Sequence, residues 1–129
     1  MADTTDKRAV PRMTLTERPA ARVRGLREVH LLDLSLTGAQ IEHLDIFRLS
    51  ASCALDLPPP CGALSLPVQV VWCTVIGRKR KLGGESHLVV RSGLRFTTLT
   101  VGQHAALAET LEHFAATRHP GVDRHRRSA

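Results

Sequence analysis

The sequence predicts a mainly β domain that ends in a single α-helix, and three observations support this. Between residues 20 and 97, apolar and polar residues alternate over several short runs, which is the period of a half-buried strand. Glycine and proline residues separate these runs. After residue 100 the apolar spacing becomes that of a helix. A chain of 129 residues can bury one core without metal or disulfide staples.

The first two predicted strands differ in length and in the strength of their sequence pattern. Residues 20–23 form a short candidate that ends before Gly25. Residues 28–35 form a stronger one, whose alternation splits the side chains into two faces. One face carries His30, Leu32, Leu34 and Leu36, and the other carries Val29, Leu31, Asp33 and Ser35. Gly38 then marks a bend or bulge, and the chain is expected to continue extended from residue 39 to residue 44.

Three longer runs complete the predicted sheet. Residues 49–57 alternate until the prolines at 58–60 end the strand. Residues 63–76 form a long strand in which we expect Trp72 to be part of the core. The basic, glycine-rich segment 77–86, with Arg78 to Lys81, is expected to be a solvated hairpin loop, and residues 88–97 its second strand. We expect Cys53 and Cys73 to be buried and Cys61 to be a loop thiol.

A helix follows the last strand. Thr100 and Gln103 fit a capping box, and Leu107, Leu111 and Phe114 recur on one helical face that is expected to pack on the sheet. The string 119–121, His-Pro-Gly, predicts its end. The chain is therefore divided into a flexible leader at 1–14, a folded domain at 15–117 and a disordered basic tail at 118–129.

Composition narrows the class of function. The formal net charge is +6 and the isoelectric point about 10.2, which favours nucleotides, nucleic acid or acidic protein surfaces as partners. Three cysteines without a C-x-x-C spacing predict no disulfide framework and fit a reducing compartment. No apolar run suits a signal peptide or a membrane span, so we expect a cytoplasmic protein without membrane insertion.

Two short motifs carry most of the chemical information. Arg8 and Arg12 place two guanidinium groups four residues apart in the leader, and the string from Asp33 through Ser35 to Gly38 places a carboxylate, a hydroxyl and a glycine at a strand end. A guanidinium can donate two parallel hydrogen bonds to a guanine edge, stack on a base or clamp a phosphate.

The second motif can complete such a site. Asp33 can accept from guanine or orient an arginine, Ser35 can donate or accept, and Gly38 allows close backbone approach. Lys7 adjoins the arginine pair as a possible accessory contact. Each string also has an ordinary interpretation. Arg8 and Arg12 could be solvated charges in a basic leader, and the string from Asp33 to Gly38 could be a strand-to-turn transition.

The order of these motifs resembles the PilZ domain family: Arg-x-x-x-Arg, then Asp-x-Ser-x-x-Gly, several strands and a terminal helix. The strings at 70–72 and 93–96 are also similar, so the resemblance runs from Arg8 to about Phe114. It implies a six-stranded antiparallel β-barrel and a receptor for the bacterial second messenger cyclic di-GMP. Under it Arg8, Arg12, Asp33, Ser35 and Gly38 are the ligand-binding residues.

The leading hypothesis is therefore a non-catalytic, single-domain receptor that needs no cofactor and signals through an unidentified partner protein. Binding is expected to order residues 5–14 against the barrel. One alternative is a PilZ-like adaptor that binds only protein. Another is a small basic barrel that binds nucleic acid, which is disfavoured because aromatic side chains for base stacking are scarce. An enzyme is least expected, since the sequence shows no nucleophile–base pair, metal cluster or phosphate loop. The sequence leaves the oligomeric state open.

Overall fold

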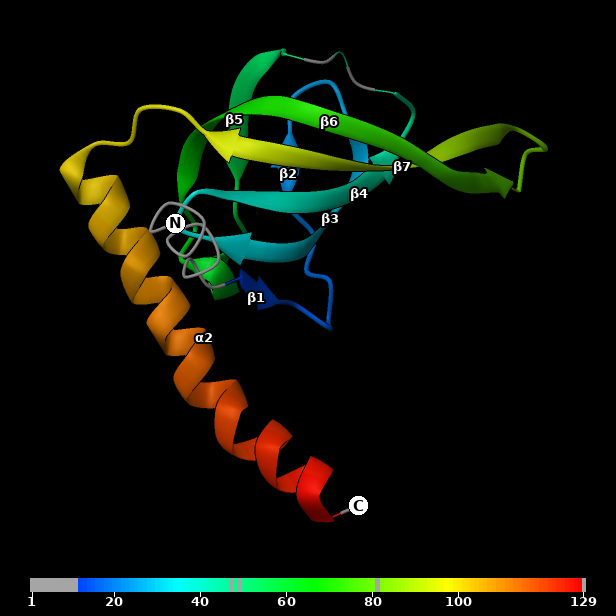
Figure 1. The fold of residues 1–129 in the computed structure, drawn as a ribbon. Helices are drawn as coiled ribbons and strands as arrows, with labels where there is room; N and C mark the ends of the chain where they lie inside the picture. The colour runs from blue at the N-terminus through cyan, green and yellow to red at the C-terminus, as the bar shows by residue number, and fades with distance from the viewer. Residues whose placement is uncertain (1–11, 47, 49, 81, 129) are drawn as a thin grey trace, which may run out of the picture.

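A computed structural model describes residues 12–46, 48, 50–80 and 82–128. Within these residues the chain forms seven strands, a short 3-10 helix and one α-helix (Figure 1). In chain order they are β1 (Arg12–Thr14), β2 (Arg22–Val23), β3 (Arg27–Ser35), β4 (Gly38–Leu44), β5 (Ser52–Asp56), η1 (Pro59–Cys61), β6 (Ser65–Arg80), β7 (Ser86–Phe96) and α2 (Val101–Ser128).

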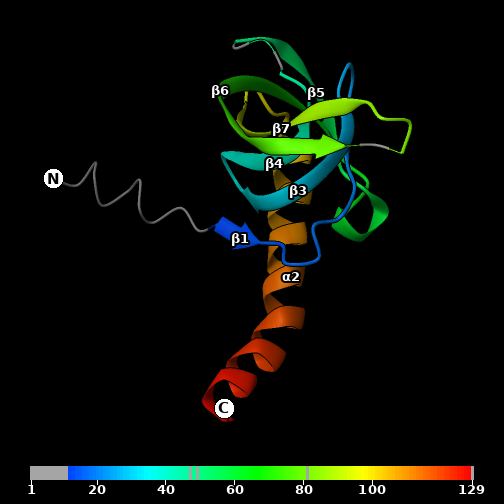
Figure 2. The same ribbon diagram turned by 90° about the vertical axis from the view of Figure 1, so that its right-hand side faces the viewer.

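All seven strands belong to one curled antiparallel sheet in the order β1-β3-β4-β7-β6-β5-β2. The sheet curls until the segment before β2 meets β3: the N–H of Leu31 donates to Pro19 O at 2.9 Å, and the N–H of Ala21 donates to Val29 O at 3.0 Å. Because β2 also pairs with β5, this segment links the two sides of the sheet (Figures 1 and 2). The predicted antiparallel barrel with one C-terminal helix is confirmed, with seven strands in place of six.

The additional strand is β1, which lies inside the predicted leader. Arg12 pairs with Ser35, Met13 with Leu34 and Thr14 with Asp33, so the leader boundary predicted at residue 14 is too late. Three residues are too few to show alternation in the sequence. They become a strand because the outer edge of β3 offers unpaired backbone groups.

The predicted faces of β3 are wrong over part of its length. Leu31 and Leu34 were assigned to opposite faces, yet both are fully buried in the core. The register of β3 against β4 shifts between Leu31 and Asp33, as expected for a bulge. The extra residue reverses the inward and outward positions that follow it.

The β6–β7 hairpin is longer than predicted. Half of the segment 77–86, expected to be a loop, is strand, because β6 continues to Arg80 and β7 begins at Ser86. Trp72 is 38% exposed and so is not a core residue, since a register shift between Val70 and Trp72 turns it outward. Cys61, predicted as a loop thiol, ends η1 and is fully buried.

The helix α2 begins as predicted. The Gln103 N–H donates to Thr100 Oγ1 at 3.0 Å, and Gln103 Oε1 accepts from the Thr100 N–H at 2.9 Å. Leu107 is fully buried against the sheet, and the N-terminal half of the helix lies along the barrel (Figure 2). The helix continues to Ser128 through the stop predicted at 119–121.

No helix in the described part of the chain is long and apolar enough to cross a bilayer.

Candidate functional site

The pairing of β1 with β3 brings the two sequence motifs together. Arg12 lies opposite Ser35 in the ladder, so the second arginine of the first motif is beside the second motif. Its side chain reaches Asp33, and the distance between Arg12 Nη1 and Asp33 Oδ1 is 2.6 Å. The structure thus joins residues that the sequence separates by 21 positions.

Asp33 is held from a second side. Its Oδ1 atom also accepts the backbone N–H of Gln40 on β4 at 3.1 Å. The Asp33 side chain is 13% exposed, whereas the Arg12 side chain is 42% exposed. A fixed carboxylate therefore orients a solvent-facing guanidinium that keeps further N–H donors for a ligand. Of the two roles that the sequence allowed for Asp33, the geometry favours the orientation of an arginine.

Ser35 organises the turn that follows β3. It is fully buried, and its Oγ accepts the backbone N–H groups of Thr37 and Gly38, each at 3.2 Å. The same hydroxyl lies 3.3 Å from Gly38 O, to which it donates. In this arrangement Ser35 fixes the turn, and its predicted direct contact with a ligand stays a prediction.

Gly38 is required by strand packing. A Cβ at this position would lie 2.0 Å from the carbonyl oxygen of Leu94 on β7. Backbone closeness is therefore the reason for glycine, and the approaching group in the structure is the neighbouring strand β7, whereas the sequence analysis named a ligand. Contact of Gly38 with a ligand likewise stays a prediction, and Arg8 and Lys7 lie outside the described residues.

A pocket of about 370 Å³ adjoins this turn, and the sequence analysis did not assign it. Its lining combines apolar side chains with polar and basic ones: Leu36, Thr37, Arg95, Phe96, Thr97, Leu99 and His104. Arg95 pairs with Gly38 in the β4–β7 ladder, and its Nη2 donates to Gln69 Oε1 at 3.0 Å. The signal that could have found Arg95 is its place in the string 93–96, between two buried residues and therefore facing outward.

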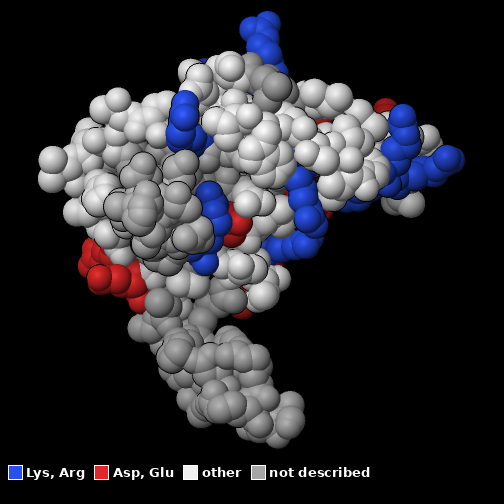
Figure 3. Space-filling model, viewed as in Figure 1, with Lys and Arg blue, Asp and Glu red and all other residues white. Residues whose placement is uncertain are grey.

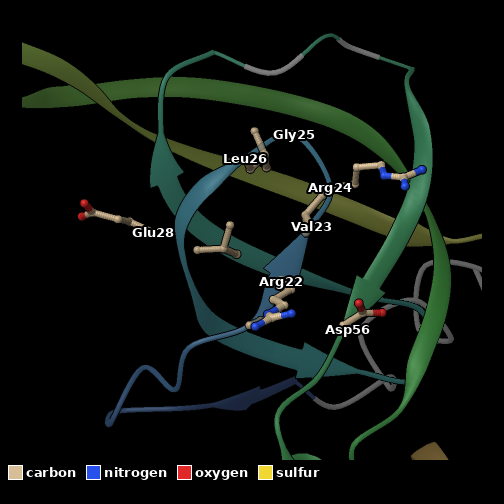
Figure 4. A pocket seen from close by; sticks show the side chains of 9 residues that line it. Arg22, Val23, Arg24, Gly25, Leu26, Glu28 and Asp56 are labelled. Carbon is tan, nitrogen blue, oxygen red and sulfur yellow. The ribbon is translucent and has the colours of Figure 1, made fainter.

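A second pocket, of about 450 Å³, lies along the segment that precedes and begins β3 (Figure 4). Arg22 and Arg24 line it together with Glu28 and Asp56. The charges of this lining balance, so it does not favour an anionic ligand. None of the predicted site residues belongs to it.

One buried contact has the composition of a nucleophile–base pair. His43 Nε2 lies 2.7 Å from Ser92 Oγ, which in turn lies 3.1 Å from Cys73 Sγ. Burial lowers the pKa of His43 below its usual value. Ser92 is fully buried and His43 is 1% exposed, so a substrate does not reach them in this structure. The described residues include no group of three or more His, Cys, Asp or Glu side chains placed to hold a metal ion.

The fold and the paired motifs define a small β-barrel domain with a guanidinium–carboxylate site at the β1–β3 edge. The chain belongs to the PilZ domain family, which it matches over residues 6–113. No match was found among the curated proteins.

Two solved structures share this fold. The PilZ domain with c-di-GMP of YcgR from Escherichia coli has a TM-score of 0.65 and 14% identity, and the alignment covers 91% of this chain and 98% of that one. MrkH, described as a c-di-GMP dependence transcription regulatory factor, has a TM-score of 0.60 and 16% identity, with 83% of this chain and 50% of that chain covered.

Proposed function

We propose that this protein is a non-catalytic receptor for cyclic di-GMP that signals through a partner protein. The observation that carries the proposal is the contact between Arg12 and Asp33. It unites the two motifs on adjacent strands and leaves an oriented, half-exposed guanidinium at their junction. Family membership and the ligand named in the YcgR structure support the choice of nucleotide.

Each predicted residue then has a role. Arg12 donates to a guanine edge or a phosphate, and Arg8, four residues earlier, supplies the second guanidinium. Asp33 holds Arg12 in position, while Ser35 and Gly38 keep the turn closed against β7. Lys7 adds a positive charge beside the pair. The pocket next to the turn supplies Arg95 as a further cation for the phosphates.

Binding is proposed to change the N-terminal surface. The ordering predicted for residues 5–14 is now confined to residues before Arg12, because residues 12–14 already pair with β3. Such ordering costs about 2–5 kcal/mol of the gross interaction energy. In return the nucleotide creates a surface that a partner protein in the cytoplasm can recognise.

Calorimetric titration with cyclic di-GMP tests the proposal. Separate titrations with GTP and cyclic di-AMP are the controls. We expect cyclic di-GMP to bind and the other two nucleotides not to bind. Arg12→Ala is expected to weaken binding by about 2–5 kcal/mol, since it leaves part of the ligand unpaired. Arg24→Ala removes an exposed arginine from the second pocket and is the matched control. Equal affinities for the Arg12 variant and the wild type would overturn the site. No binding by the wild type would favour an adaptor without nucleotide.

A further inference from the structure

The far half of the β6–β7 hairpin projects beyond the end of β4 (Figure 1). The pairing of β7 with β4 ends at Val89, whereas its pairing with β6 continues to Arg80 opposite Ser86. This projecting segment, residues 78–80 and 82–88, is called the hairpin tip below.

One face of the hairpin tip is electrically neutralised. Lys79 Nζ lies 2.9 Å from Glu28 Oε1 on β3. His87, directly opposite Lys79 in the ladder, lies 3.5 Å from an Asp45 oxygen and 3.2 Å from a Glu85 oxygen. Every basic group that the structure describes on this face therefore has a carboxylate beside it.

The other face keeps its charge. Arg78 and Arg80 alternate with Lys79 along β6 and so project from the opposite side. Both are exposed, and Arg78 Nη1 donates only to Ser86 Oγ, at 3.4 Å. Neither arginine has an acidic partner among the described residues. Figure 3 shows basic side chains gathered at this end of the molecule.

Two exposed aliphatic side chains lie on or next to the hairpin. Leu82, in the turn of the hairpin tip, is 108% exposed, and Ile46 is 63% exposed. The backbone N–H of Asp45 donates to Leu88 O at 2.8 Å, which places the segment with Ile46 next to the hairpin. Single exposed apolar side chains are common on protein surfaces. Leu82 is informative because it follows, within four residues of sequence, two arginines that have no acidic partner among the described residues.

We propose that the hairpin tip docks on the surface of a membrane that contains anionic lipids. Arg78 and Arg80 would lie at the level of the headgroups, and Leu82 would enter the boundary of the acyl chains. A nucleic acid could use the two arginines but would leave the leucine in water, so the lipid surface accounts for both features. The attachment is peripheral and does not depend on cyclic di-GMP.

Co-sedimentation with vesicles, without nucleotide, tests this inference. At low salt the wild type is expected to bind vesicles made of phosphatidylcholine mixed with phosphatidylglycerol. It is not expected to bind vesicles made only of phosphatidylcholine. Arg78→Gln with Arg80→Gln should weaken binding by about fivefold for each arginine. Leu82→Ser should weaken it by about tenfold.

The matched control is Thr98→Glu with Ala105→Glu, which changes the net charge by the same two units at exposed positions beyond the other end of β7. It should bind within about twofold of the wild type. The proposal fails if the wild type does not bind the anionic vesicles or if the arginine variant behaves like this control. It also fails if Leu82→Ser binds as the wild type does, or if a DNA duplex binds more tightly than the vesicles.

Discussion

The guanidinium of Arg12 and the carboxylate of Asp33 meet at 2.6 Å across the β1–β3 edge. Because Asp33 also accepts the Gln40 N–H, the carboxylate is held by a second hydrogen bond from β4. Asp33 thus orients the Arg12 guanidinium, which faces solvent where the proposed nucleotide would bind. Four predictions follow from this and related contacts.

Asp33→Asn should weaken cyclic di-GMP binding without unfolding the protein. A hydrogen bond to a charged group contributes about 1.5–3 kcal/mol, so we expect a loss of about tenfold to a hundredfold in affinity. The free energy of unfolding should change by less than about 1 kcal/mol, since the Arg12 side chain is half-exposed. Calorimetry and urea denaturation measure the two effects. Asp56→Asn, which removes an exposed carboxylate bonded to Ser65, should leave affinity unchanged. Equal affinities for the two variants would contradict the role of Asp33.

Gly38→Ala should destabilise the fold. The new Cβ would lie 2.0 Å from Leu94 O, so β4 and β7 must separate locally. Overpacking of this kind costs about 1–3 kcal/mol, which urea denaturation can measure. Gly77→Ala is the control, because no atom lies within 4 Å of its added Cβ. If both variants lose the same stability, strand closeness is not the reason for glycine at position 38.

Gly93→Ala should displace the indole of Trp72. An added Cβ would lie 2.1 Å from Trp72 Nε1, so the side chain must move. Trp72 is the one tryptophan of the chain, and its fluorescence therefore reports the shift directly. In a Trp72→Ala background the same glycine substitution should cost less stability than in the wild type. Additive costs in this double-mutant cycle would show that the indole and Gly93 do not interact.

Stability should fall as the solution becomes acidic, through His43. Burial lowers its pKa in the folded state, so the unfolded chain binds the proton more readily. The contribution of neutral His43 is complete above the unfolded pKa of about 6.5 and is lost as the pH falls through the lower folded pKa. Urea denaturation across this range measures it. His43→Gln should flatten the profile, and an unchanged slope would assign the pH dependence to other groups.

The local features of the sequence predicted much of the fold. Alternation located six strands, the capping box located the start of α2, and Leu107 was placed correctly in the core. These signals succeed because they depend on residues that are close in sequence. Alternation reflects a strand with one solvent-exposed face, and a capping box satisfies the free N–H groups in the first turn of a helix. The same analysis identified both motifs of the candidate site.

Other features depend on contacts between distant segments. Arg12–Thr14 became a strand because β3 had a free edge, and Trp72 turned outward because a bulge shifted β6 against β7. Cys61 was predicted in a loop because three prolines precede it, yet the fold buries it fully in the hydrophobic core. A pattern that spans only a few residues does not indicate which distant segment of the chain those residues will contact.

The amino-acid order alone determined the class of fold, the two motifs and the strong positive charge. Tertiary structure decided that Arg12 would meet Asp33, that Ser35 and Gly38 would support the turn, and that only one face of the hairpin tip would keep its charge. The reason is geometric: propensity and periodicity act over a few residues, whereas strand pairing and ion pairing join groups that only the closed barrel brings within reach.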